Sequence, residues 1–393
     1  MSEEGKGEPA TPARELVHCP NCDRDVPPGE FCGACGAHLL DSAGPAHRRH
    51  AFAAHPGEHV VHLSVVSTLL PHLPHRSAAP FRIGLVVAAV VLVAFGLLRL
   101  TGPTIALAAA AVPVLYLIYL YEVEVYEDEP LWIIGSTVVL GVVLGAIWAL
   151  VTGAGITQSR VVALTHGPDA GAVLVSGILV PVVAQLLMLV GALFIFMTRR
   201  FYDEALDGFT FGAAGALGFS FATTLVDLFP DLSQGLFSSA PALLNTMEIV
   251  QRGLLIPIIN ASTTGLIAGS LWLWRGESRA AARHRQFSSL PAAVAVAILV
   301  QAVLGVAGIV IPDPTLVVVV YALAAGLLLV WVRVAIHHML LAEAVEVAIG
   351  PPMVCSHCHR MVPRMAFCAH CGIATRATPK TGEGRAGRAV RKV

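Results

Sequence analysis

The sequence predicts an all-α polytopic membrane helix bundle of about eight transmembrane helices, with a small β unit built around cysteines at each end. Three observations lead to this fold class. Hydrophobic residues make up 56% of the chain and charged residues only 13%, whereas a soluble globular protein carries about 25% charged residues. Several apolar stretches are long enough to cross a bilayer. All the cysteines fall in two sets of four that lie outside those stretches.

The chain opens with a polar stretch over 1–14, "MSEEGKGEPATPAR", that predicts disorder and no secretory signal peptide. The first cysteine unit follows over 15–40, and its cysteines are Cys19, Cys22, Cys32 and Cys35. Two CxxC pairs separated by nine residues suit a tetrahedral zinc ion with no open coordination position. Each pair would form a knuckle whose backbone amides hydrogen-bond the sulfurs, and Gly33 and Gly36 permit such tight turns.

The next segment, 41–80, is rich in histidine, with "EHVVH" at 58–62 and "PHLPH" at 71–75. We interpret it as a linker that lies at the membrane interface, because its apolar run at 60–70 is too short to span a bilayer. A second metal site or a pH sensor is the alternative that the histidines leave open.

The membrane domain is predicted over 81–345. Its spans are expected at 81–100, 103–121, 131–151, 171–197, 208–229, 254–274, 290–311 and 315–341. An even count puts both termini on one side, and the short loops rich in Lys and Arg place that side in the cytoplasm, so we expect a multi-pass protein of the cytoplasmic membrane. The segment 230–250 leaves a re-entrant element open.

A second cysteine unit is expected over 350–374 and repeats the first 336 positions later. Its cysteines are Cys355, Cys358, Cys368 and Cys371. Disulfides are the alternative to zinc, but the reducing cytoplasm disfavours them. The wording "CPNC…FCGACG" resembles the short zinc ribbons found at the ends of bacterial membrane proteins. That resemblance implies two structural zinc ions and a surface for binding a cytoplasmic protein, and the two ribbons could also pair with each other.

The last segment, 375–393, is basic and is expected to be disordered. Its charges favour binding to anionic membrane lipid. Nucleic acid is the less favoured partner, because the tail carries no aromatic side chains for base stacking.

The stretch "DEALDGFTFGAAGALGF" (203–219) resembles the segment "D-x-x-DG-x-x-YG-x-x-x-GLGF" of the PrsW family of intramembrane metalloproteases. The resemblance covers about half of the chain and excludes both ribbons. It implies a helix bundle whose metal and water are served by a Glu-Glu-x-x-Lys motif, a later Glu-Asn pair and histidines on subsequent helices. Such a centre needs anionic or imidazole ligands and a carboxylate that takes the proton of the water.

The resemblance places other residue types at these catalytic positions. The family positions fall on Ala184, Gln185, Met188, Thr223, Thr224, Asn260 and Gln301. Amides and hydroxyls are weak zinc ligands, and none acts as a general base at neutral pH. We expect the polar ones to face one another in a neutral hydrogen-bonded cluster, because each is costly in lipid without a partner. The alternative is that each one separately links two helices.

These features favour a non-catalytic adaptor or sensor, a pseudoprotease whose bundle holds a transmembrane client protein. The alternative is an active PrsW-type endopeptidase with displaced ligands such as Glu248, Asp227 or His166. A channel or transporter is disfavoured, because the bundle shows no convincing charged pair at mid-membrane and no clear internal repeat. Close glycine spacings at 141/145, 208/212 and 265/269 allow tight helix contacts.

Overall fold

The structure is a computed structural model. It describes residues 16–20, 24–39, 79–98, 100–123, 131–167, 169–198, 205–234, 242–275, 289–343, 349–355 and 357–375. The chain divides into two compact units. One joins Met1–Glu58 to Ala344–Thr381, and the other joins His59–Glu343 to Gly382–Val393. The predictions for 1–14, the histidines of 41–80, Cys22 and 376–393 lie outside the described residues.

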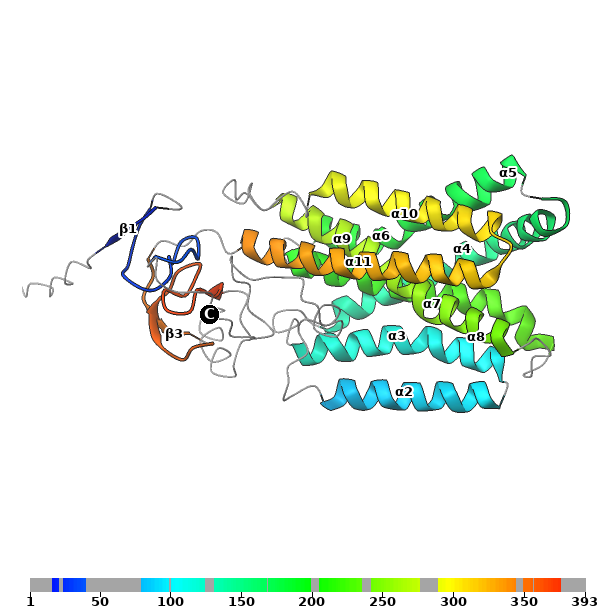
Figure 1. Ribbon diagram of the computed structural model, residues 1–393, viewed down its shortest axis with the longest axis horizontal. Coiled ribbons are helices and arrows are strands. Elements are labelled where there is room, and N and C mark those ends of the chain that lie inside the picture. Colours follow the sequence, from blue (N-terminus) through cyan, green and yellow to red (C-terminus); the bar gives the residue numbers. More distant parts are fainter. Residues whose placement is uncertain are drawn as a thin grey trace, which may run out of the picture. The chain divides into compact units, whose positions relative to one another are not determined.

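The described part of the second unit is helical. Its elements are α2 (Ala79–Leu97), α3 (Thr101–Val123), α4 (Leu131–His166), α5 (Ala170–Ala172), η1 (Val173–Leu179), α6 (Val180–Thr198), α7 (Ala205–Gln234), α8 (Ala242–Val250), η2 (Gln251–Leu255), α9 (Ile256–Arg275), α10 (Leu290–Val310) and α11 (Pro314–Glu343). The π-helical segments η1 and η2 continue directly into α6 and α9. Each of the eight predicted spans coincides largely with these helices, which run side by side as a bundle (Figure 1).

Among the described residues, six helices are long and apolar enough to cross a membrane. The apolar stretches of α2 and α3 are shorter, Arg82–Leu97 and Gly102–Tyr116, so eight spans is an approximate number. The expected span 131–151 agrees with the candidate span Trp132–Gly153 of α4, and the helix continues beyond it to His166. The described residues of 230–250 extend α7 and form α8. Helix α8 leads through η2 into α9, and this candidate span begins at Thr246 instead of 254.

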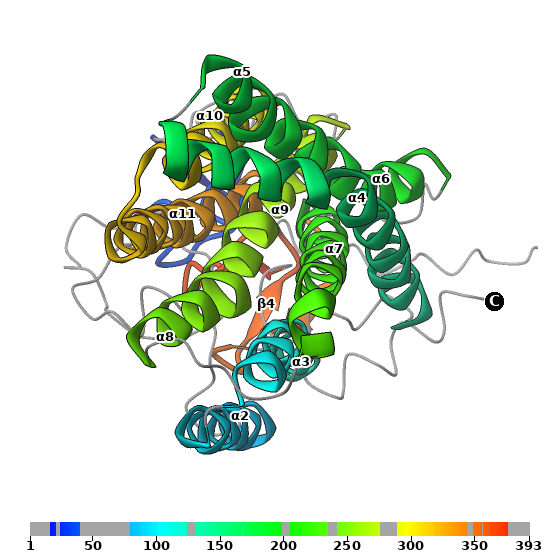
Figure 2. The same cartoon turned by 90° about the vertical axis from the view of Figure 1, so that its right-hand side faces the viewer.

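Helices α7 and α9 form the centre of the bundle. The candidate spans that contain them are 72% and 67% buried, whereas the other four are 22–33% buried. Seen nearly end-on, α7 and α9 lie inside, and α2 lies at the rim against α3 (Figure 2). The outer helices expose large apolar side chains such as Leu97, Leu150 and Leu327. Such a surface suits lipid, where apolar side chains need no further cover.

Glycines bring the backbones of the central helices into contact. A Cβ on Gly141 would collide with the carbonyl oxygen of Gly215, so α4 packs closely on α7 at this point. A Cβ on Gly212 would lie 2.8 Å from the carbonyl oxygen of Thr264, which sets the distance between α7 and α9. Small residues at helix crossings gain dispersion contacts that lipid tails cannot supply.

The first unit contains two ribbons, which we name the N-terminal ribbon (16–39) and the C-terminal ribbon (349–375). The N-terminal ribbon has the antiparallel strands β1 (Val17–Cys19) and β2 (Arg24–Val26). The C-terminal ribbon has β3 (Pro352–Val354) and β4 (Met361–Pro363), also antiparallel. The expected all-α bundle with small β units at both ends is thus the fold.

The two ribbons bind each other through a reciprocal pair of backbone hydrogen bonds. The amide of Phe31 donates to the carbonyl of Ala369 at 2.9 Å, and the amide of Phe367 donates to the carbonyl of Gly33 at 2.8 Å. Phe31 and Gly33 correspond to Phe367 and Ala369 in the 336-residue repeat, so the contact is pseudo-symmetric. Because the ribbons touch, both lie on the same side of any membrane that the bundle crosses. The bundle must then cross it an even number of times.

The glycine contact between α4 and α7 predicts a graded loss of stability. Gly141→Leu should lower the free energy of unfolding by about 1–3 kcal/mol or more, because the new side chain meets backbone atoms that cannot move aside. Gly135→Leu on the same helix is the control, since a Cβ on Gly135 would have no other atom within 4 Å. Thermal unfolding in detergent measures both; equal effects of the two substitutions would contradict the close contact.

Candidate functional site

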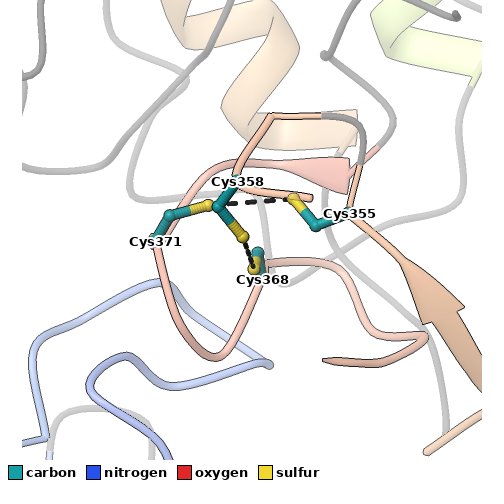
Figure 3. A group of neighbouring side chains, drawn as sticks. All are labelled: Cys355, Cys358, Cys368 and Cys371. Carbon is teal, nitrogen blue, oxygen red and sulfur yellow. Dashed lines mark hydrogen bonds between the residues drawn. The ribbon is translucent and has the colours of Figure 1, made fainter. Parts of the chain in front are cut away.

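The C-terminal ribbon brings four cysteine sulfurs to one point. Cys355 and Cys358 come from the loop that starts after β3, and Cys368 and Cys371 come from the loop that follows β4. Their Sγ atoms all lie within 4.8 Å of one another, and Figure 3 shows the four side chains converging. The pairs Cys355–Cys371 and Cys358–Cys368 are each 3.8 Å apart.

The predicted knuckles are present. Backbone amides of His357 and Cys358 donate to the sulfur of Cys355, and those of His370 and Cys371 donate to Cys368. Turns of this kind need a residue with positive φ after the second cysteine of each pair. Gly372 supplies it with φ 69°, and His359 adopts φ 56° at the equivalent place.

Hydrogen bonds among the cysteine sulfurs shift their pKa values in opposite directions. Hydrogen bonds from Cys368 and then Cys371 hold the pKa of the Cys355 thiol far below its ordinary value. The reciprocal bond with Cys355 raises the pKa of Cys368 to about 11. A bound metal ion would replace the protons that these sulfurs share in hydrogen bonds, because metal ligation requires thiolates.

The N-terminal ribbon repeats this arrangement. Cys19, Cys32 and Cys35 bring their sulfurs within 4.8 Å of one another, with Cys19 and Cys35 3.8 Å apart. The fourth predicted ligand, Cys22, lies outside the described residues. Gly36 has φ 72° and forms the expected turn. Gly33 has another role than predicted, because a Cβ there would collide with the Met365 sulfur of the other ribbon.

The sulfur distances favour a metal over disulfides. A disulfide requires about 2.05 Å between sulfurs, and the seven described cysteines are free. Four sulfurs placed about 2.3 Å from a tetrahedral zinc ion are about 3.8 Å apart, which matches the observed separation. Each cysteine cluster can therefore hold a metal ion.

A second candidate site lies inside the bundle, where six amide and hydroxyl side chains from four helices meet. Gln185 on α6 is at its centre and is 1% exposed. Its Nε2 donates to the Thr264 hydroxyl at 2.9 Å. Its Oε1 accepts from Gln301 Nε2 at 3.0 Å and lies 2.9 Å from the Thr263 hydroxyl.

Asn260 on α9 extends the network toward α7. Its Oδ1 accepts from Gln301 Nε2 at 2.9 Å, and its Nδ2 donates to the Ser220 hydroxyl at 2.9 Å. Gln301 on α10 thus uses both protons of its amide group, one toward Gln185 and one toward Asn260. The polar groups satisfy one another, as a polar group buried within a bilayer must.

Unusual backbone segments precede two of the helices that carry the network. The π-helical turns η1 and η2 come shortly before Gln185 and Asn260. π-helical turns are uncommon and are found frequently at functional sites. In η1, the carbonyl of Gly177 would collide with a Cβ on Gly305 of α10. This crossing sets α10 against α6 one turn from Gln301 and so brings the two glutamines together.

The structure joins Gln185, Asn260 and Gln301 as expected but leaves both threonines of α7 outside the bonds described. Thr223 donates to the carbonyl of Ser220 on its own helix at 3.0 Å. Thr224 is buried. The sequence interpretation missed Ser220, Thr263 and Thr264, which lie three to four residues from expected members on the same helices. That helical spacing is the signal that could have identified them.

The other two resemblance positions, Ala184 and Met188, lie in an apolar cluster. Met188 is buried with Ala216 and Phe219 of α7, and Ala184 packs against this group. Neither side chain can donate or accept a strong hydrogen bond. Neither of these two neighbours of Gln185 on α6 is therefore an ionisable residue.

The network does not fit a catalytic zinc ion. Zinc in proteolytic centres takes imidazole, thiolate or carboxylate ligands, whereas this network offers neutral amide and hydroxyl groups that already bind one another. It also contains no carboxylate to take a proton from water. No reaction step through a metal follows from these residues.

Among the described residues, the displaced ligands Glu248 and Asp227 belong to no group of three or more metal-ligating side chains. Glu248 lies 3.3 Å from Arg252 on the next helical turn, and Asp227 is exposed near the end of α7. The side chain of His166 is outside the described ones. Among the described residues, groups of three or more His, Cys, Asp or Glu side chains close enough to share a metal occur at the two ribbons.

A family model described as PrsW family intramembrane metalloprotease matches residues 129–335. This range contains α4 to α10, most of α11 and every residue of the network. No curated protein and no solved structure matches the chain.

A double-mutant cycle should detect the network as a unit. Gln185→Met and Gln301→Met should each cost about 1 kcal/mol of unfolding free energy, because each leaves buried polar partners without a bond. Together they should show a coupling energy of about 0.5–2 kcal/mol. The control pairs Gln301→Met with Thr104→Val. In the contacts described, the Thr104 hydroxyl donates to the carbonyl of Leu100, four residues earlier, and so lies outside the network. Additive behaviour of the two glutamines would contradict the network.

Proposed function

The chain belongs to the PrsW family of intramembrane metalloproteases, and on that basis we propose that it is a catalytically silent member that acts as a membrane adaptor or sensor. One observation carries the proposal. The residues that the resemblance places at the catalytic centre include Gln185, Asn260 and Gln301, and these three form a neutral, mutually satisfied network. A network of this kind holds four helices together and offers nothing to activate water.

In this proposal the bundle binds a transmembrane segment of a client protein without cutting it. The scaffold of the family is retained over 129–335, and recognition of a membrane segment depends on the scaffold as well as on the catalytic groups. Lipid contacts come from the apolar outer surface, and the basic tail adds attraction to anionic lipid.

The ribbons supply the cytoplasmic half of the function. We assign one structural zinc ion to each, because tetrahedral thiolate sites are typical of zinc. The paired ribbons would present one surface to a cytoplasmic protein. The bias of Lys and Arg toward the short loops on one side supports a cytoplasmic position for both ends in the cytoplasmic membrane.

An active intramembrane endopeptidase is the second candidate, favoured by the family match itself. It requires a third metal ion within the bundle, held by ligands other than the network. Its ligands would have to come from residues such as Glu248 or Asp227 after a rearrangement that separates Glu248 from Arg252.

Metal content separates the two candidates. Protein purified in detergent should contain two zinc ions per chain and none after all eight cysteines are changed to serine. A third metal ion that survives the cysteine changes would contradict a silent centre. The same preparations, placed in liposomes with transmembrane substrates and with an active family member as positive control, should release no cleavage product.

The position of the termini is tested by reporter fusions. A reporter that is active only in the cytoplasm should be active at both ends, because the ribbons touch and the charge bias puts them inside. Activity at one end and not the other would contradict the ribbon pairing. Inactivity at both ends would leave the pairing intact and contradict the cytoplasmic position.

A further inference from the structure

The two ribbons repeat each other in sequence, but their cores are built differently. The core of the N-terminal ribbon consists of Cys19, Val26 and Cys32 together with Met365, which comes from the C-terminal ribbon. Met365 is 3% exposed. It lies against Gly33. In the sequence, Gly33 stands between Cys32 and Cys35, two predicted metal ligands of the N-terminal ribbon.

Among the described residues, the apolar core of the C-terminal ribbon includes no side chain from the N-terminal ribbon. This core is formed by Cys355, Val362 and Cys368, with Met353, Cys358 and Cys371 packed around them, all from the same ribbon. In the 336-residue repeat, the counterpart of Met365 is Gly29. A Cβ at Gly29 would collide with the carbonyl oxygen of Ala369, so this position has no room for a reciprocal side chain.

Other described contacts between the ribbons flank the metal ligands, and one of them joins Glu30 Oε1 to His370 Nδ1 at 3.7 Å. The amide donors Phe31 and Phe367 precede Cys32 and Cys368, and the acceptors Gly33 and Ala369 follow them. Each ribbon therefore holds its amide donor and its carbonyl acceptor in the right position only while its own cysteine loop is folded. In small ribbons of this kind, the metal supplies much of the folding free energy.

We propose that the C-terminal ribbon completes the N-terminal metal site, so that the two zinc ions load in a fixed order, C-terminal first. Met365 is the positioning residue that couples the sites. The inference rests on the zinc assignment made under the proposed function. The C-terminal ribbon folds around its own metal ion first. The N-terminal ribbon then folds against Met365 and against the Phe367 amide and Ala369 carbonyl of the C-terminal ribbon. When zinc becomes scarce, the N-terminal site empties first.

The first experiment removes one ribbon at a time in the full chain. The N-terminal quartet changed to serine (Cys19, Cys22, Cys32 and Cys35) should leave one zinc ion, held as tightly as in the unchanged protein. The C-terminal quartet changed to serine (Cys355, Cys358, Cys368 and Cys371) should leave well under one, although four N-terminal cysteines remain. One tightly held zinc ion in both variants would overturn the coupling. Absence of zinc from the unchanged protein would instead contradict the zinc assignment.

The second experiment keeps all eight cysteines and changes Met365. Met365→Ala should lower the affinity for one of the two zinc ions by about tenfold or more, as measured by competition with a chelator. Truncating a buried methionine to alanine costs more than the 1.4 kcal/mol that corresponds to a tenfold change in affinity. Met361→Ala is the matched control, since Met361 lies in the same ribbon and is 65% exposed. Met365→Leu should restore the affinity, because leucine fills a similar volume.

Alkylation identifies which site is weakened. In Met365→Ala, partial chelation should expose Cys19, Cys32 and Cys35 to alkylation before the C-terminal cysteines, as read by mass spectrometry. Equal release from both ribbons, earlier release from the C-terminal ribbon, or identical behaviour of Met365→Ala and Met361→Ala would each overturn the proposal.

Discussion

A polar group within a bilayer must find its hydrogen-bond partner inside the protein, and this constraint governs the bundle. It makes the backbone helical in each of the described candidate spans. It also explains why Gln185, Asn260 and Gln301 meet, since each amide would be costly against lipid. Such a meeting requires short distances between helices. Glycines at the crossings, such as Gly177 with Gly305, allow those distances.

The ribbons solve a different problem. Each is too small to bury a sufficient apolar core, so cysteine clusters able to hold a metal stand at the centre of each one. Their contact through Phe31, Gly33, Phe367 and Ala369 joins segments from opposite ends of the chain. That contact constrains the bundle in turn, because both ends must emerge on one side. The even number of crossings therefore has a structural reason as well as a basis in charge bias.

Much of this architecture could be predicted from the sequence, because hydropathy reports spans directly and cysteine spacing reports metal-ligand geometry. The eight apolar stretches all proved helical, and the two cysteine sets form clusters in the residues described. The composition could not show that η1 and η2 are π-helical, since this depends on packing with α10 and α3. Nor could it show that His359 takes the place of a turn glycine, or that Met365 belongs to the core of the other ribbon. These features arise from contacts between distant segments.

Under the proposed function, amides occupy the positions where a catalytic centre needs ionisable groups, and this changes what the bundle depends on. Carboxylates and imidazoles gathered around a metal become unpaired buried charges when the metal leaves, and their cost would strain the helices that carry them. A network of Gln185, Asn260, Gln301 and nearby hydroxyls is neutral and complete without an ion. A bundle with a silent centre of this kind would keep its fold whatever the metal supply, while ribbons that hold zinc would respond to it. Zinc would then control the pairing of the chain ends and leave the membrane scaffold unchanged, a division of roles that suits an adaptor more than a protease.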